Sequence, residues 1–365
     1  MKNIAVFFGG VSVEHDVSII TGVMTLNSLD RTKYNPVPVY VTTKGEWLTG
    51  ELLFDLDNYK DLDQKKLNRA TFLSGENVLY SVKKNKLKAV ADIAVAINCM
   101  HGERGEDGSL SGLTAMCKIP LASPQTLASA VCMDKSFTKI VLAGLKVKTL
   151  PYFYAEREEQ LKNLPAKLTY PLIVKPNCLG SSVGINVAND QKQLLTAFRF
   201  AKRFGDGVIT EPCLNGFKEI NCAGYRTPDK CVKVSECEQP VGRTEILSFA
   251  DKYKGGKRVF PAEIEKSLSD KIKETTEKVY TALKCQGVIR IDYFIKDKEI
   301  YLNEINTVPG SLAHYLFGQT MKDFSSMINE LISVAETNFA KESTFVTKNR
   351  TDILSGVGSK GAKHN

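Results

Sequence analysis

The feature that most constrains the fold is an alternation of apolar strands with a helix in the first hundred residues. The pattern predicts a buried strand at 3–8 that ends in Gly9-Gly10, a helix at 17–29, and further strands at 37–41 and 93–97. Strands that alternate with helices form parallel sheets, whose ligands lie beyond the carboxyl ends of the strands. The sequence therefore predicts an N-terminal parallel α/β domain.

The pattern changes after residue 124. Helices and shorter strands follow, with α+β character in the second half. We expect helices at 133–143, 269–283 and 322–336, and strands at 172–175, 183–187, 208–211, 288–295 and 299–305. The predicted domains are an N-terminal α/β domain (1–124), a central domain (125–217), a C-terminal domain (218–338) and a polar basic tail (339–365).

Composition excludes several classes of protein. With 43% hydrophobic and 25% charged residues, the chain has the composition of a globular protein. It lacks the ~18 consecutive apolar residues of a membrane span, and its first apolar run is too short for a signal peptide, so we expect a cytoplasmic protein. The net charge of +8 comes without a basic stripe interleaved with aromatics, which argues against nucleic acid. The nine cysteines have no C-x-x-C spacing and are expected to be reduced thiols.

Two common nucleotide-binding motifs give negative results. The chain has no G-x-x-x-x-G-K-[ST] phosphate loop. A G-x-G-x-x-G pattern occurs at Gly356, Gly358 and Gly361, but it lies in the tail, without a preceding strand or room for a helix. These features exclude a dinucleotide-dependent oxidoreductase as the leading hypothesis.

The segment Gly180-Ser181-Ser182-Val183-Gly184 is a candidate phosphate-binding loop. Two glycines around two serines supply backbone N–H and hydroxyl donors that suit a loop closing over phosphates. Lys175 ends the preceding predicted strand and could add positive charge there. Taken alone, the loop is explained equally well as a flexible hairpin tip. The nearby Lys175 then favours phosphate binding over that explanation.

The strongest signal is a pair of strands with acidic residues. Period-2 alternation places Arg290 and Asp292 on one face of the first strand, and Glu304 and Asn306 on one face of the second. Two carboxylates and an amide, without histidine or cysteine, are suited to Mg²⁺ bound to phosphates. Arg290 could stabilise charge on a transferring phosphoryl group.

This arrangement requires an irregularity in the pairing of the two strands. With a turn at 296–299 and regular pairing, Asp292 would lie opposite Asn303, and Glu304 would face the other side. A different turn length or a β-bulge must therefore shift the register if all three ligands are to converge.

With these motifs in this order, the sequence resembles the D-alanine–D-alanine ligases of the ATP-grasp superfamily over roughly residues 3–335. The occurrence of these motifs together and in the family's order is a more specific signature of the family than any single motif. The motifs are Phe8-Gly9-Gly10 with residues 14–18, His101-Gly102 with 105–108, Met133-Asp134-Lys135, Lys175, 180–184, Asp251-Lys252-Tyr253, Arg290-Ile291-Asp292 and 304–310.

The resemblance implies a three-domain ATP-grasp architecture and a set of site residues. It implies ATP binding by Lys135, Lys175, Gly180, Ser181, Ser182, Glu211, Cys213, Leu214, Glu219 and Lys252, with two Mg²⁺ ions, or Mn²⁺, on Asp292, Glu304 and Asn306. It implies catalytic roles for Glu14, Ser181, Tyr253, Arg290 and Gly310, and substrate binding by Glu14, His101, Lys252, Ser311, Tyr315 and Leu316.

The implied reaction joins two D-alanines for peptidoglycan synthesis in the cell wall. The first carboxylate attacks the γ-phosphate of ATP to give an acyl phosphate and ADP, and the second amine then displaces phosphate. A lid over about residues 248–257 would exclude water from the acyl phosphate. The family also implies a cytoplasmic homodimer with no membrane or nucleic-acid partner.

One departure leaves the second substrate open. Tyr315 stands where the family has a serine that anchors the second carboxylate. Tyr253 in the lid favours an amino acid over a hydroxy acid as acceptor, by family analogy. D-serine therefore remains an alternative to D-alanine, and a non-catalytic nucleotide-binding relative is a further alternative.

Overall fold

Strand β1 (Lys2–Gly9) lies at the centre of the parallel part of the N-terminal sheet. The computed structural model describes residues 1–241 and 257–347. Strand β1 pairs in parallel with β2 (Tyr34–Val41) and β6 (Lys86–Asn98), and α1 (His15–Ser28) connects β1 to β2. The predicted parallel strands and helix are confirmed, and α1 begins directly beyond the carboxyl end of β1.

Three further strands make this sheet mixed. Strands β3 (Trp47–Thr49), β4 (Asn68–Phe72) and β5 (Val78–Lys83) pair in antiparallel fashion and close the sheet from β2 round to β6. The sheet is parallel only at β1, β2 and β6, and the sequence did not predict these three additional strands. These strands are short and mostly half-exposed, so they lack the continuous apolar runs by which buried parallel strands are recognised.

The central domain is a four-stranded sheet covered by one helix. The strand order is β7 (Phe153–Ala155), β10 (Val208–Pro212), β8 (Leu172–Pro176), β9 (Asn186–Ala188), and α5 (Gln191–Ala201) packs on β8 and β9. The helix predicted at 133–143 corresponds to α4 (Lys135–Gly144), and a helix that was not predicted, α3 (Thr126–Met133), precedes it with a break at Asp134. The break occurs because Asp134 is extended and caps α4, its carboxylate accepting the Phe137 N–H at 2.9 Å.

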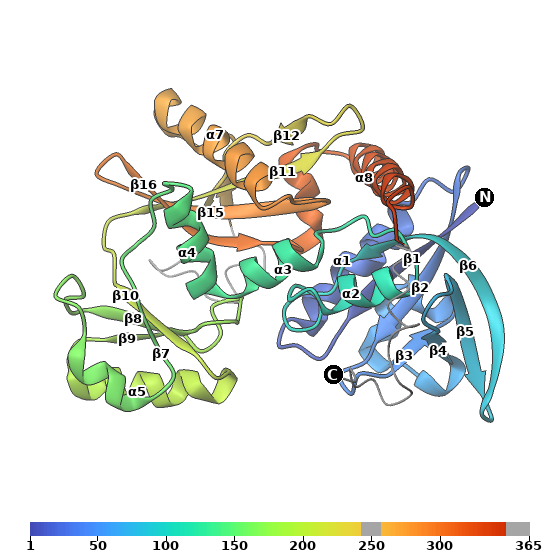
Figure 1. Cartoon of the computed structure of the whole chain (residues 1–365), viewed down its shortest axis with the longest axis horizontal. Coiled ribbons are helices and arrows are strands. Elements are labelled where there is room, and N and C mark those ends of the chain that lie inside the picture. Colours follow the sequence, from blue (N-terminus) through green and yellow to red (C-terminus); the bar gives the residue numbers. More distant parts are fainter. Residues whose placement is uncertain (242–256, 348–365) are drawn as a thin grey trace, which may run out of the picture.

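The C-terminal domain carries the acidic strands on an antiparallel sheet. Its order is β12 (Val232–Val234), β11 (Lys218–Arg226), β15 (Val288–Lys296), β16 (Glu299–Asn306), and α7 (Lys266–Ala282) packs on it. Figure 1 shows this sheet between the central domain and the N-terminal domain. The remaining elements are β13 (Gln239–Val241), β14 (Lys257–Val259), α2 (Ser109–Met116), α8 (Met321–Glu342) and the 3₁₀ helices η1 (Glu51–Phe54), η2 (Leu56–Asp61), η3 (Gln64–Lys66), η4 (Glu158–Asn163), η5 (Lys202–Phe204) and η6 (Gly310–Leu316).

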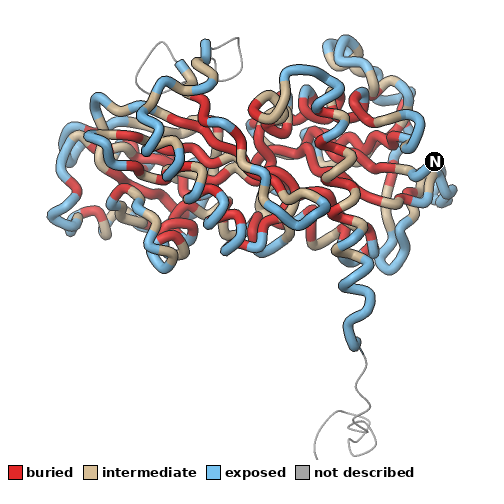
Figure 2. Tube along the Cα trace, turned by 90° about the horizontal axis from the view of Figure 1, so that it is seen from above, coloured by how far each residue is buried: buried red, intermediate tan, exposed pale blue. Residues whose placement is uncertain are grey.

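One hydrophobic core joins the two ends of the chain. Helix α8 and η6 pack on α1, and buried residues from β1, α1, β11 and α8 form one cluster. Figure 2 shows buried segments in both halves of the molecule, with exposed residues at the rim. Helix α8 extends six residues beyond its predicted end at 336. No helix in the described ranges is long and apolar enough to cross a membrane.

Candidate active site

The two acidic strands have the register shift that the sequence required. Regular pairing runs from Lys296 opposite Glu299 to Tyr293 opposite Leu302. A bulge then leaves Asn303 without a partner in the ladder and sets Asp292 opposite Glu304. The prediction of a shifted register is confirmed, and the acidic side chains converge on one face of the sheet.

Asp292 is the most enclosed member of this group, with 1% of its surface exposed. Its carboxylate accepts two hydrogen bonds from the Arg290 guanidinium, at 2.7 and 3.0 Å, and one from the Asn306 amide at 3.0 Å. With Glu304 directly across the ladder, the group offers two carboxylates and an amide oxygen. These hard oxygen donors fit Mg²⁺.

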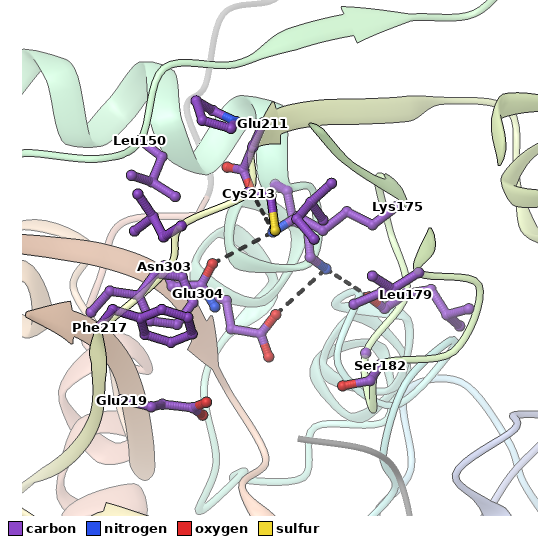
Figure 3. A pocket seen from close by; sticks show the side chains of 17 residues that line it. Leu150, Lys175, Leu179, Ser182, Glu211, Cys213, Phe217, Glu219, Asn303 and Glu304 are labelled. Atoms are coloured by element: carbon purple, nitrogen blue, oxygen red, sulfur yellow. Dashed lines mark hydrogen bonds and ion pairs between the residues drawn. The ribbon is translucent and has the colours of Figure 1, made fainter. Parts of the chain in front are cut away.

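A cavity of about 820 Å³ opens beside the acidic strands, between the central and C-terminal sheets. Figure 3 shows its lining. Apolar groups such as Leu150 and Phe217 line it together with charged side chains such as Lys175 and Glu304. An apolar-walled cavity that also presents lysines and acidic side chains fits a nucleotide with its phosphates.

A buried carboxylate holds two lysines at one end of this cavity. Glu211, at the end of β10, lies 2.5 Å from the Lys139 ammonium and 2.6 Å from that of Lys175. Burial alone would raise the pKa of Glu211, but the ammonium groups of Lys175 and Lys139 hold it at about 2. Counting these three side chains, the cluster has one positive charge in excess, which favours an anionic ligand.

Lys135 connects the candidate phosphate loop to the acidic strands. It is the first residue of α4, and its ammonium donates to the Leu179 carbonyl at 2.6 Å. The same nitrogen lies 3.7 Å from a Glu304 carboxylate oxygen. Lys175 likewise reaches the bulged Asn303 at 3.5 Å. Both lysines therefore point to the region where phosphates would meet the acidic group.

A second cavity, of about 360 Å³, adjoins the first at Lys135, Gly180 and Glu304. Glu14, directly before α1, lines it and accepts a hydrogen bond from the Ser181 hydroxyl. Ser181 and Ser182 have positive φ, which turns the loop between β8 and β9 toward the N-terminal domain. A side chain at Gly180 would contact the Glu14 carboxylate, so glycine permits this close approach. Glu14 places negative charge where a small ammonium ligand could bind.

The other predicted site residues lie in three places. Cys213, Leu214 and Glu219 line the larger cavity, with Glu219 at the end away from Glu211 (Figure 3). Helix η6 carries four of the predicted residues: Gly310, Ser311, Tyr315 and Leu316. Leu316 is buried in the core, and the Arg258 guanidinium lies 5.0 Å from the centre of the Tyr315 ring.

His101 is buried, and its ring lies 3.0 Å from the Thr21 hydroxyl. Lys252 and Tyr253, and the predicted lid up to residue 256, lie outside the described residues.

Sequence reasoning missed several residues of this region. Lys139 lies four residues after Lys135, on the same face of α4, and this spacing could have revealed it. Thr21, Glu106 and Arg258 gave no comparable signal, because their contacts join segments far apart in the chain.

Two family models match the chain, "D-ala D-ala ligase N-terminus" over residues 3–124 and "D-ala D-ala ligase C-terminus" over 142–333. The D-alanine–D-alanine ligase of Thermosipho melanesiensis is 37% identical over 93% of this chain and 95% of that protein. The Thermosipho africanus ligase is 34% identical over 97% and 98%.

Solved structures agree with these sequence matches. The D-alanine–D-alanine ligase from Helicobacter pylori has a TM-score of 0.76 at 29% identity, covering 91% of this chain and 98% of that one. The VanG D-Ala:D-Ser ligase from Enterococcus faecalis has a TM-score of 0.79 at 28% identity, covering 92% and 99%.

Proposed function

Because the chain belongs to the D-alanine–D-alanine ligase family, we propose that it joins two D-alanines in an ATP-dependent reaction that releases ADP and phosphate. The product, D-alanyl-D-alanine, serves peptidoglycan synthesis. The observation that carries this proposal is that Glu304, which lies opposite Asp292 in the ladder, lines two adjoining cavities. One cavity suits a nucleotide, and the other presents Glu14 to a small ammonium ligand.

The larger cavity is assigned to ATP. Lys135, Lys175 and the loop residues Gly180, Ser181 and Ser182 would hold the phosphates, while Glu211, Cys213 and Leu214 border the adenine and Glu219 holds the ribose. Lys252 would join the phosphate contacts from outside the described residues. The apolar walls support the adenine site, and the ammonium groups of Lys135 and Lys175, which lie near Glu304 and Asn303, support the phosphate site.

Asp292, Glu304 and Asn306 are assigned to two Mg²⁺ ions, with Mn²⁺ as an alternative ion. Their carboxylate and amide oxygens fit such ions. Bound there, the metal neutralises negative charge on the phosphates. Arg290 hydrogen-bonds Asp292 and is thereby held in place beside the same phosphates.

The first D-alanine is assigned to the smaller cavity. Glu14 would pair with its ammonium, in a network with Ser181 and Tyr253, and would leave its carboxylate directed at the γ-phosphate. Attack there forms D-alanyl phosphate and ADP. The amine of the second D-alanine then attacks the acyl carbon, Arg290 and the Gly310 N–H stabilise the oxyanion, and phosphate leaves.

The acceptor end is assigned to Ser311, Tyr315 and Leu316 on η6, with Lys252 and with His101 behind them. Tyr315 and Arg258 together offer a hydroxyl and a guanidinium in place of the family's serine. D-serine is the alternative acceptor, because a D-Ala:D-Ser ligase is among the structural neighbours.

The test is phosphate release from Mg²⁺-ATP with D-alanine, with L-alanine, or with D-alanine plus D-serine, each product identified by mass. D-alanyl-D-alanine from D-alanine alone is the expected result. Poor turnover with D-alanine but formation of the mixed dipeptide would assign D-serine to the second site. No D-amino-acid-dependent turnover would refute ligase function.

We also propose a cytoplasmic homodimer, with no membrane or nucleic-acid partner. Met116 at the end of α2 and Leu127 on α3 are 69% and 63% exposed, and Gly112 on α2 faces open space. Large exposed apolar side chains beside a small residue suit a helix-to-helix contact between two copies. Light scattering of the native chain and of Met116→Glu tests this, and an unchanged mass for the variant would exclude this face.

A further inference from the structure

The segment after β16 is held by side chains from the N-terminal domain. The Val308 N–H donates to a Glu106 carboxylate oxygen at 2.8 Å, and the Ser311 N–H donates to the Thr21 hydroxyl at 3.0 Å. Gly310 lies between these two points of attachment. The direction of its own N–H is therefore fixed from both sides by residues that are distant in sequence.

His101 connects the two attachments. Its Nε2 lies 3.0 Å from the Thr21 hydroxyl, and its ring also makes a hydrogen bond with the Val308 backbone. Burial lowers the pKa of His101 to about 4, so the ring is neutral at pH 7 and has a single N–H. The Thr21 hydroxyl thus makes hydrogen bonds with both the His101 ring and the Ser311 N–H, so His101 links the Val308 attachment to the Ser311 attachment.

These three residues, Thr21, His101 and Glu106, form what we call the clasp. Thr21 and His101 are 1% and 3% exposed, and neither lines the two cavities. Glu106 also accepts the Gly102 N–H at 2.9 Å, which ties the clasp to the loop that follows β6. Because Thr21 lines neither cavity, it influences the reaction through the segment that it holds.

The backbone of that segment needs such support. Ser311, Leu312 and Ala313 have successive φ values of 52°, 48° and 48°. L-residues rarely adopt this left-handed conformation, and it persists only where surrounding contacts enforce it. Without the clasp, we expect the segment to relax and the Gly310 N–H to turn away from its present direction.

We propose that Thr21, His101 and Glu106 are positioning residues that pre-orient the Gly310 N–H toward the oxyanion of the second reaction step. The proposal rests on the ligase function and on the role assigned to Gly310. A donor that is fixed before the reaction stabilises developing charge without reorganisation. The phosphoryl-transfer step does not use this N–H, so loss of the clasp should slow peptide-bond formation selectively.

Thr21→Val tests this, because valine keeps the shape of threonine but removes the hydroxyl. Two readouts are needed: the rate of dipeptide formation, and D-alanine-dependent positional isotope exchange in γ-labelled ATP, which reports reversible acyl phosphate formation. We expect kcat for dipeptide to fall about 10- to 100-fold, less than for loss of the donor itself. Isotope exchange and the KM for ATP should remain near native values. Thr21→Ser, which retains the hydroxyl, should recover kcat.

Equal loss of exchange and dipeptide formation in Thr21→Val would overturn the proposal, and so would native kcat. If Thr21→Val does not fold, Thr21→Ala is measured with the same two readouts and judged by the same outcomes. Failure of the ligase assignment is distinguishable, because the native chain itself would then show neither D-alanine-dependent exchange nor dipeptide.

Discussion

Replacing Glu211 by glutamine should destabilise the chain by about 3–5 kcal/mol, because it removes the carboxylate shared by two buried lysines. The side chains of Lys139, Lys175 and Glu211 are 2%, 8% and 3% exposed. A glutamine carbonyl can accept from one ammonium but neutralises neither. With an unfolding entropy of about 2.1 cal/mol/K per residue over 365 residues, this loss of stability corresponds to a fall in Tm of roughly 4–7 °C.

Thermal unfolding of four chains measures this effect. Lys139→Met should cost less than Glu211→Gln, because Glu211 keeps its pair with Lys175. The double variant should recover part of the loss, since it leaves one unpaired lysine in place of two. The deficit of Glu211→Gln should also shrink as pH rises, because an unpaired buried lysine has a lowered pKa and is relieved once it loses its proton.

Two results would refute this reasoning. If the Tm of Glu211→Gln lay within about 1 °C of the native value, water or backbone groups would have to compensate for the lost partner of the two lysine charges. A double variant no more stable than Glu211→Gln would mean that the two side chains do not act as one charge cluster. The native chain should in addition lose the Glu211 contribution as pH falls from the unfolded-state value of 4.5 toward 2.

Three further predictions concern the reaction site. Arg290→Ala should reduce kcat by about two to three orders of magnitude, as expected for the loss of a preorganised group that stabilises charge. Near-native turnover of this variant in steady-state assays would refute that role for Arg290. Asp292→Asn should raise the Mg²⁺ concentration needed for half-maximal activity by at least about tenfold, measured by titration at fixed ATP; an unchanged requirement would exclude it as a ligand. Burial, together with Glu14, raises the pKa of Glu106 to about 7, so its contribution to stability is present below the unfolded-state value of 4.5 and is lost as pH rises to 7. The difference in unfolding free energy between native and Glu106→Gln chains should follow that course, and a difference that is flat from pH 4.5 to 8 would contradict it.

The acidic strands show which features of this site can be predicted from the sequence. Alternation placed Arg290 and Asp292 on one face, and counting across the turn showed that Glu304 could join them only after a register shift. The bulge at Asn303 supplies that shift. Such predictions succeed because strand geometry is local and has a fixed period of two.

Other features depend on contacts that no local pattern encodes. Strands β3 to β5 are too short and too exposed to give a periodic signal, and the break between α3 and α4 depends on a single cap at Asp134. Thr21 and Ser311 meet only because α1 and η6 pack together in the folded chain.

The clasp also determines at which stage of its synthesis the chain can form a complete site. Its contacts join residues separated by 202 and 290 positions. A ribosome adds about 5–20 residues per second. The synthesis of Ser311 therefore follows that of Thr21 by roughly 15–60 seconds. Lys135 and Lys175 are made earlier, but Asn303 and Glu304, which complete the lining of the larger cavity, are made only shortly before Ser311. A chain terminated before residue 303 is therefore expected to lack both the complete cavity and the clasp, which delays activity until almost the whole folded region has left the ribosome.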